Sequence, residues 1–322
     1  MAGGVSSLLR RLSHIRPIWC VVRSAGNVAV RVCRERKDVV MRLTRAFSAA
    51  GFVVLLVLSA CQPVMVEPTM AEGDGATKVS VIATDEGLQY TGVTETGMPS
   101  GLATFSFENE RTDAEFAPSI LRLNDDTTLD EFVEAAKSEN SMSAISLVTL
   151  YGGSWLQPGD SMTYETYLTP GDYVFLEQTE TGLADMRTFS VMEGDEKSDA
   201  DVPASDVTVS LQEFAFIMPD TVAAGEHMWR ISNDGEQWHE ISIIPVSEGT
   251  TEADVLDMAS DPNSEDEPDA AFQFGPISNG IETWTVVNLE PGTYAALCFL
   301  PDVAGDYAPH LEHGMIRVFT VE

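Results

Sequence analysis

The chain has 322 residues, with 51 acidic and 18 basic side chains and 44% apolar residues. That apolar fraction is enough to build a core for each of two ordinary domains, and it excludes an intrinsically disordered chain. The formal net charge is −33. Such a charge excludes nucleic-acid binding, because contact with phosphates needs clustered lysine and arginine.

The first sixty residues differ sharply in composition from the rest. A basic stretch at 42–45 precedes an apolar run at 46–58, and two small residues, Ser59 and Ala60, stand directly before Cys61. This order is typical of a secretory signal peptide. The Leu-Ser-Ala-Cys sequence that ends at Cys61 resembles the bacterial lipobox, in which the cysteine is lipidated and becomes the mature N-terminus. An uncleaved membrane anchor is the alternative, but the apolar run is shorter than the ~20 residues that span a bilayer.

We therefore interpret 1–40 as an upstream extension, 41–60 as a lipoprotein signal peptide and 61–77 as a flexible tether. Lipidation at Cys61 predicts an extracytoplasmic protein, anchored to a membrane at the outer cell surface or in the periplasm. Residues 1–60 hold 10 of the 18 basic and only 2 of the 51 acidic residues, so the mature chain carries a net charge near −41. This charge favours solubility, and docking to a basic redox partner is the alternative reason for it.

Two segments, 78–191 and 206–322, contain short alternating or β-branched runs separated by turn residues. This pattern is typical of an all-β sandwich. The acidic stretch 192–205 has no apolar pattern, and we interpret it as an interdomain linker. The sequence predicts two tandem Greek-key β-sandwiches, each with a short helical insertion.

The two segments also match each other. A Leu-x-Pro-Gly-x-Tyr turn ends at Tyr173 in the first segment and at Tyr294 in the second. A tyrosine at such a corner can hydrogen-bond the nearby backbone while its ring packs in the core. A short helical pattern is expected at 129–136 and again at 252–259. A tandem duplication explains these correspondences.

Four residues of the second segment make up a ligand set for copper. His239 precedes a strand, Cys298 ends the strand that begins at Tyr294, and His310 and Met315 follow just before the last strand. Two imidazoles and a thiolate, with a weak axial thioether, form the His₂Cys(Met) geometry of electron-transfer copper.

This segment resembles the plastocyanin/azurin family of cupredoxins. In that family one histidine comes from an early strand, and the cysteine, second histidine and methionine come from the loop between the last two strands. The resemblance implies a cupredoxin-like fold and one type 1 copper held by His239, Cys298, His310 and Met315. Eleven residues separate Cys298 from His310, a longer interval than in simple cupredoxins, so this loop must bulge outward and return.

Two further histidines and the first segment complete the inventory. His313 competes with His310, but it leaves only one residue before Met315, and His227 is expected to be an exposed polar residue. The first segment contains no histidine or cysteine. Alignment of the two copies places Phe116 at the position of His239 and Glu177 at that of Cys298. The first domain is therefore expected to be a degenerate copy without copper ligands.

The function that this set predicts is one-electron transfer, and not enzymatic catalysis. Multicopper oxidases and copper nitrite reductases need further histidines, often in His-x-His groups, and the chain has none of these groups. Two alternatives remain open: copper capture or delivery without redox turnover, and a metal-free interaction or adhesion module that keeps only the fold.

Overall fold

The structure is a computed structural model, and it describes residues 76–93, 97–138, 141–179, 182–194, 202–260 and 269–322. The expected upstream extension, signal peptide, Cys61 and nearly all of the tether lie outside the described residues, as does the middle of the expected linker. Among the helices of the described part, none is long and apolar enough to cross a membrane.

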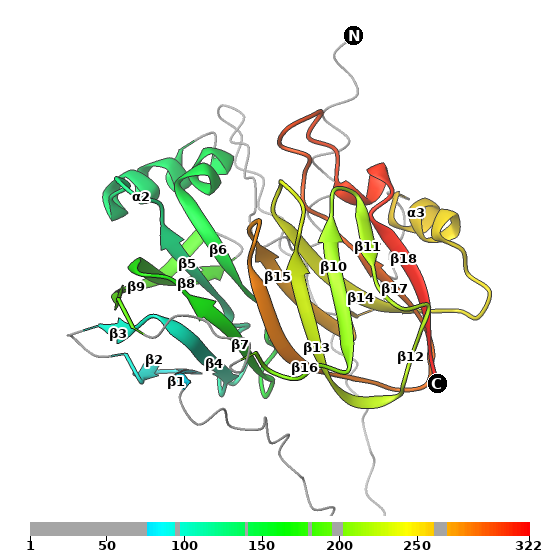
Figure 1. Cartoon of the computed structure of the whole chain (residues 1–322), viewed down its shortest axis with the longest axis horizontal. Helices are drawn as coiled ribbons and strands as arrows, with labels where there is room; N and C mark the ends of the chain where they lie inside the picture. The colour runs from blue at the N-terminus through cyan, green and yellow to red at the C-terminus, as the bar shows by residue number, and fades with distance from the viewer. Residues whose placement is uncertain (1–75, 94–96, 139–140, 180–181, 195–201, 261–268) are drawn as a thin grey trace, which may run out of the picture. The chain divides into compact units, whose positions relative to one another are not determined.

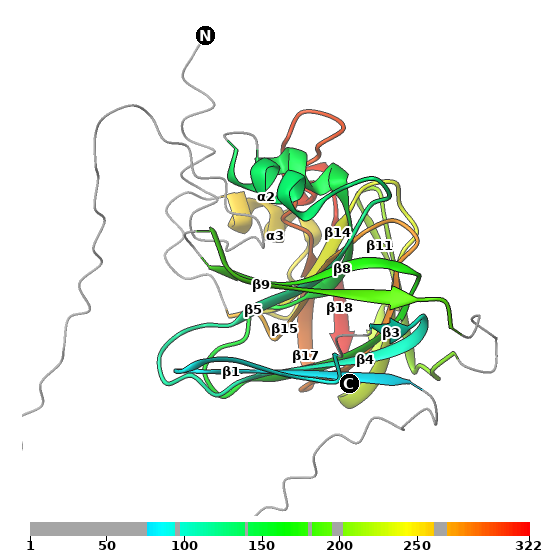
Figure 2. The same ribbon diagram turned by 90° about the vertical axis from the view of Figure 1, so that its left-hand side faces the viewer.

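The first sandwich packs a four-stranded layer against a five-stranded layer, with the order β2-β1-β4-β7 in one and β6-β5-β8-β9-β3 in the other. Figure 2 shows β1 and β4 side by side, and they pair in parallel. The strands are β1 (Thr77–Thr84), β2 (Gly87–Thr91), β3 (Met98–Pro99), β4 (Gly101–Asn109), β5 (Ala117–Leu123), β6 (Val148–Gly153), β7 (Ser161–Leu168), β8 (Gly171–Thr179) and β9 (Gly182–Met192).

The core of this sandwich follows from alternation along the strands. From Ala103 onward every second residue of β4 is buried, including Phe105 and Phe107, and these rings pack on Tyr164 of β7. Alternate side chains of a strand point to opposite faces of its sheet, so one face of β4 meets the core. Strand β5 is buried along nearly its whole length. It pairs with β6 on one side and with β8 on the other, which makes it an inner strand of its layer.

The second sandwich repeats this plan, with layers β11-β10-β13-β16 and β15-β14-β17-β18-β12 (Figure 1). Its strands are β10 (Val207–Gln212), β11 (Ala215–Ile217), β12 (Thr221–Val222), β13 (Gly225–Asn233), β14 (His239–Val246), β15 (Phe272–Ile277), β16 (Glu282–Leu289), β17 (Gly292–Leu297) and β18 (Ile316–Val321). As in the first copy, its first and fourth strands, β10 and β13, pair in parallel.

The layers of the two sandwiches are continuous. Strand β7 pairs with β16 through Thr166↔Thr283, and β6 meets β15 at Tyr151↔Ile277. The result is one sheet of eight strands and one of ten. The predicted fold class is therefore confirmed, and joining of the sheets is a feature that the sequence did not indicate.

The short helices lie within one residue of their predicted ranges. Helix α2 (Leu129–Lys137) begins with a capping box, in which Thr128 and Glu131 satisfy each other's backbone N–H groups. Helix α3 (Glu252–Ser260) begins after Thr251, whose hydroxyl accepts from the backbone N–H of Asp254. Two 3₁₀ segments complete the description: η1 (Ser141–Leu147) and η3 (His310–His313).

The strand register confirms the alignment of the two copies. Ser119 pairs with Leu176 in the first sandwich, and Ser242 pairs with Leu297 at the equivalent place in the second. Counting outward from these pairs, the residue after Leu176 is Glu177 and the residue after Leu297 is Cys298.

Candidate metal centre

Three strand ends and one helical turn position the predicted ligands. His239 is the first residue of β14, and Cys298 directly follows β17, which pairs with β14. His310 begins the 3₁₀ turn η3, which precedes β18. Because β17 also pairs with β18, the chain returns from η3 to the strand that it has just left. The two neighbours of β17 thus bring both histidines to the end at which Cys298 lies.

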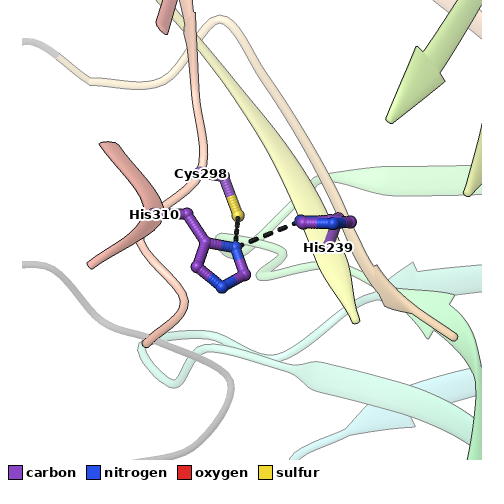
Figure 3. A group of neighbouring side chains, drawn as sticks. All are labelled: His239, Cys298 and His310. Carbon is purple, nitrogen blue, oxygen red and sulfur yellow. Dashed lines mark hydrogen bonds between the residues drawn. The ribbon is translucent and has the colours of Figure 1, made fainter. Parts of the chain in front are cut away.

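The three side chains meet in the interior (Figure 3). Nδ1 of His239 lies 3.1 Å from Nδ1 of His310, and Sγ of Cys298 lies 3.4 Å from the same His310 nitrogen. All three residues are 0% exposed. One ligand atom from each lies within 4.8 Å of those of the other two. The His310 nitrogen that meets the thiol and the other imidazole is therefore Nδ1, and Nε2 of His239 lies instead 3.5 Å from a carboxylate oxygen of Glu213.

Burial sets the protonation of this group in the metal-free protein. Desolvation lowers the pKa of His239, although the carboxylate of Glu213 opposes the effect. Desolvation, together with the neighbouring His239, lowers the pKa of His310 to about 4. Both imidazoles are therefore neutral at pH 7. Burial and the nearby Glu240 raise the pKa of the Cys298 thiol well above its usual range.

The spacing fits a small thiophilic metal ion. Metal–nitrogen bonds of about 2.0 Å and metal–sulfur bonds of about 2.3 Å, arranged in a trigonal plane, separate the donor atoms by roughly 3.5 Å. The observed separations of 3.1 and 3.4 Å are a few tenths of an ångström shorter. A small outward movement of the side chains would admit an ion. A buried thiol with a raised pKa keeps its proton and is a poor ligand until a cation displaces that proton. Binding of a metal ion to Cys298 would therefore release one proton.

Met315 is tied to two of these residues through its backbone. Its carbonyl accepts from the N–H of Cys298 at 3.3 Å, and its N–H donates to the carbonyl of His310 at 3.0 Å. The side chain is fully buried in the same apolar cluster as Cys298. The fourth predicted ligand thus belongs to the same group of buried residues.

The long interval between Cys298 and His310 folds back on itself, as its length required. Pro301 and Pro309 form an isolated β-bridge, and Asp302 N–H donates to the carbonyl of Ala308 at 2.8 Å. His310 N–H in turn donates to the carbonyl of Leu300 at 2.8 Å. The insertion is therefore a small hydrogen-bonded hairpin whose two ends lie beside the ligands.

His313 lies in a separate group, which removes it from competition with His310. Its Nε2 lies 3.1 Å from a carboxylate oxygen of Asp306 and 3.7 Å from one of Asp302. Those carboxylates also accept from the backbone N–H groups of Ala308 and Ala304. These contacts close the insertion. His227 was expected to be exposed and is instead partly buried, with Nε2 3.2 Å from the carbonyl of Ala224.

The sequence did not single out the two residues at the tip of the β10–β11 hairpin. Glu213 places a carboxylate oxygen 3.5 Å from Nε2 of His239. The ring of Phe214 lies edge-on to His310, with centroids 5.2 Å apart, and also contacts the ring of His313 at 4.7 Å. Nothing in the local sequence marks these residues, since glutamate is abundant and the hairpin lies more than twenty residues from His239.

At the equivalent place the first domain holds an ion pair. Glu177, which corresponds to Cys298, accepts two hydrogen bonds from Arg111, at 2.5 and 3.1 Å. The Arg111 guanidinium also lies 5.6 Å from the centre of the Phe116 ring, and Phe116 corresponds to His239. The scaffold is the same, but the chemistry at this end of the first domain is different.

The fold and this group of residues define the class: a protein of two tandem β-sandwich domains whose C-terminal domain carries a buried His₂Cys cluster, with a methionine, of the kind that suits a type 1 copper site. No family model matches the sequence, and no curated protein does.

Several solved structures are similar to the chain. Reduced auracyanin from Roseiflexus castenholzii shares 24% identity over 36% of this chain and 94% of its own, with a TM-score of 0.25. Auracyanin A of Chloroflexus aurantiacus, described as a blue copper protein, shares 19% over 36% and 98%, with a TM-score of 0.24. A blue copper oxidase from Nitrosomonas europaea shares 12% over 76% and 84%, with a TM-score of 0.21.

Proposed function

We propose that the protein is an extracytoplasmic, lipid-anchored copper protein that transfers single electrons through its C-terminal domain. His239, Cys298 and His310, with Met315 as a weak fourth ligand, would hold the ion. When bound there, copper supplies a Cu(II)/Cu(I) couple. The observation that carries the proposal is that Nδ1 of His310 lies 3.4 Å from the Cys298 sulfur and 3.1 Å from Nδ1 of His239, inside the apolar core.

The surroundings of the cluster support electron transfer over chemistry on a substrate. All three donor residues are 0% exposed, so a substrate molecule has no direct route to them. A cavity of about 900 Å³ is lined by Trp155, Met162 and Phe272 among others, but by none of the three. An electron can cross a layer of packed side chains, whereas a reacting molecule must touch the metal. The backbone hydrogen bonds of Met315 with Cys298 and His310 would limit movement of the ligands between the two oxidation states.

The test is to load the purified protein with Cu(II) and record its visible absorption. One equivalent should bind and produce an intense colour, because charge transfer from the thiolate to the metal absorbs strongly. Cys298→Ser should abolish the colour, and His239→Ala or His310→Ala should disrupt the site. His313→Ala is the matched control, because this histidine lies in a separate group, and it should leave the colour unchanged.

Other results would favour the other functions. Stoichiometric binding without colour would indicate copper capture or delivery with no thiolate ligand. Absence of binding would leave the metal-free interaction module. In either case the electron-transfer proposal would be wrong.

The membrane location is part of the proposal and has its own test. Lipidation at Cys61 would tether the acidic domains to a membrane surface, within reach of redox partners. Cys61→Ser should therefore release the protein into the soluble fraction or block its maturation. If Cys61→Ser stays on the membrane and still carries residues 41–60, the segment is an uncleaved anchor instead.

A further inference from the structure

The two histidines of the cluster have different surroundings at their outer nitrogens. Within the described part of the chain neither Nε2 makes a hydrogen bond, but Nε2 of His239 lies 3.5 Å from a carboxylate oxygen of Glu213, whereas no carboxylate lies as close to Nε2 of His310. Phe214 lies edge-on to His310 and offers no acceptor there. The hairpin tip thus places a charged residue beside one imidazole and an apolar ring beside the other.

Glu213 is held in place by the chain segment that leads to His239. One of its oxygens accepts from the backbone N–H of Gln237 at 2.8 Å and from that of Glu236. Partial burial raises the pKa of Glu213, but these two backbone donors outweigh that effect, and the net pKa is lowered. The residue is therefore an anion at neutral pH, with a fixed position relative to His239.

Gly235 shows how closely the two side chains approach. A Cβ at this position would lie 2.6 Å from one Glu213 oxygen and 2.9 Å from Nε2 of His239. Real Cβ atoms essentially never make contacts below 3.0 Å. The bare backbone of Gly235 therefore makes room for the carboxylate and the imidazole to meet.

Electrostatics assign the tautomers of the metal-free pair. A lone pair on Nε2 of His239 would face the Glu213 anion and be repelled, so the proton of this neutral ring belongs on Nε2. Nδ1 of His239 is then an acceptor, and Nδ1 of His310 donates to it across 3.1 Å. The partnerless Nε2 of His310 is then a bare lone pair, which is less costly to leave in an apolar setting than an unpaired N–H.

We propose that Glu213 is a positioning residue of the metal centre: its carboxylate accepts the Nε2–H of His239 and so presents the Nδ1 lone pair of that ring to the metal. The inference rests on the proposed copper centre. Metal-bound histidines usually donate their second N–H to a carboxylate, carbonyl or water, which fixes the ring and strengthens it as a ligand. The 3.5 Å contact is long for a hydrogen bond, and the few tenths of an ångström that the ligands must move to admit an ion are enough to close it.

Three variants separate the position of the carboxylate from its charge. Glu213→Ala removes both, and Cu(II) affinity should fall at least tenfold, the loss typical for partners of metal-bound histidines. Glu213→Gln keeps an acceptor but removes the charge. The Cu(II) affinity of this variant should fall less. Its Cu(II)/Cu(I) ratio at a fixed potential should shift about tenfold toward Cu(I), which corresponds to a rise of about 59 mV in the reduction potential. Gly235→Ala keeps the charge but pushes apart the carboxylate and the His239 ring, so its Cu(II) affinity should fall at least as far as that of Glu213→Ala.

Glu236→Gln is the matched control, because it removes a neighbouring exposed charge whose backbone, not side chain, contacts Glu213. It should leave both Cu(II) affinity and potential at wild-type values. Equal affinity and potential in Glu213→Ala and Glu236→Gln, in a protein whose wild type does bind coloured copper, would overturn the inference and leave the proposed function intact.

The metal-free protein provides a readout that does not depend on copper. Nitrogen-15 NMR of the imidazole rings should place the proton of His239 on Nε2 and that of His310 on Nδ1. In Glu213→Ala the Nε2–H share of His239 should fall. A wild-type His239 with its proton on Nδ1 would overturn the inference whether or not the protein binds copper. If the wild type binds no copper but shows these tautomers, the proposed function fails while the positioning by Glu213 stands.

Discussion

Glu177 and Phe116 occupy in the first domain the positions that Cys298 and His239 hold in the second. The thiol is replaced by a carboxylate that is nearly as buried, with 5% of its side chain exposed, and Arg111 supplies the compensating charge. A buried carboxylate without such a partner would pay a large desolvation cost. The first domain thus holds a hydrogen-bonded ion pair where the second holds the thiol and one of the imidazoles.

Stability measurements can test this exchange. Arg111→Met should destabilise the protein by about 3 kcal/mol, because Glu177 would remain buried without a partner. Adding Glu177→Leu should recover much of the loss, since two apolar side chains can replace a buried pair. Urea unfolding followed by circular dichroism would measure both. Asp125→Ala, which breaks the exposed pair with Arg122, is the control and should cost less than about 1 kcal/mol. Equal losses for Arg111→Met and Asp125→Ala would show that burial does not make the first pair important.

At this scale the sequence indicated the donors and missed their surroundings. His239, Cys298 and His310 could be selected because histidine and cysteine are scarce in this chain and because these three stand beside predicted strand ends of the second segment. Glu213 could not be selected, because it is one of 51 acidic residues and its role depends on where a hairpin tip lies. The ion pair of Arg111 with Glu177 was missed for the same reason.

The corners at which the last hairpins begin show how an element keeps its geometry in both copies. Tyr173 donates to the carbonyl of Thr169 at 2.9 Å, and Tyr294 donates to that of Glu290 at 3.0 Å. Each bond spans four residues and fixes the turn before the strand that leads to Glu177 or to Cys298. In the second domain this corner sets the direction of β17, and therefore the place at which the thiol emerges.

The tip of the β10–β11 hairpin is the element that gives the two histidines different neighbours, Glu213 and Phe214. Phe214 adopts a positive φ of 59°, which an aromatic residue seldom does. This conformation keeps Glu213 and Phe214 together in a two-residue turn over the two histidines. Short helices and strands were predictable from caps, turns and alternation. The placement of this tip was not, because it depends on parallel pairing between β10 and β13 that no local pattern specifies.

The two sandwiches are held together by pairing between their edge strands, which makes their sheets continuous. Besides the β7–β16 pairing, Thr166 Oγ1 donates to the carbonyl of Glu282 at 2.8 Å, and Thr285 Oγ1 donates to that of Thr163 at 3.0 Å. In the other layer, Ser154 Oγ donates to the carbonyl of Gln273 at 2.8 Å. The sequence predicted two domains joined by a linker, and nothing in the strand patterns of β7 or β16 distinguishes an edge that meets another domain from an edge that meets solvent.

Continuous sheets predict that the two sandwiches unfold together and share the stabilisation that a metal provides. Binding that is confined to the folded state adds about 2.7 kcal/mol when free ligand is a hundred times its dissociation constant. If the junction couples the domains, scanning calorimetry should show one transition in the metal-free protein, and copper should move the whole of it upward. Hydrogen exchange should then slow on loading in β5, which lies in the domain without ligands. Cys298→Ser, treated with the same copper, is the control and should show neither change. Two transitions, of which copper moves only one, would show that the strand pairing between the two domains does not couple their folding.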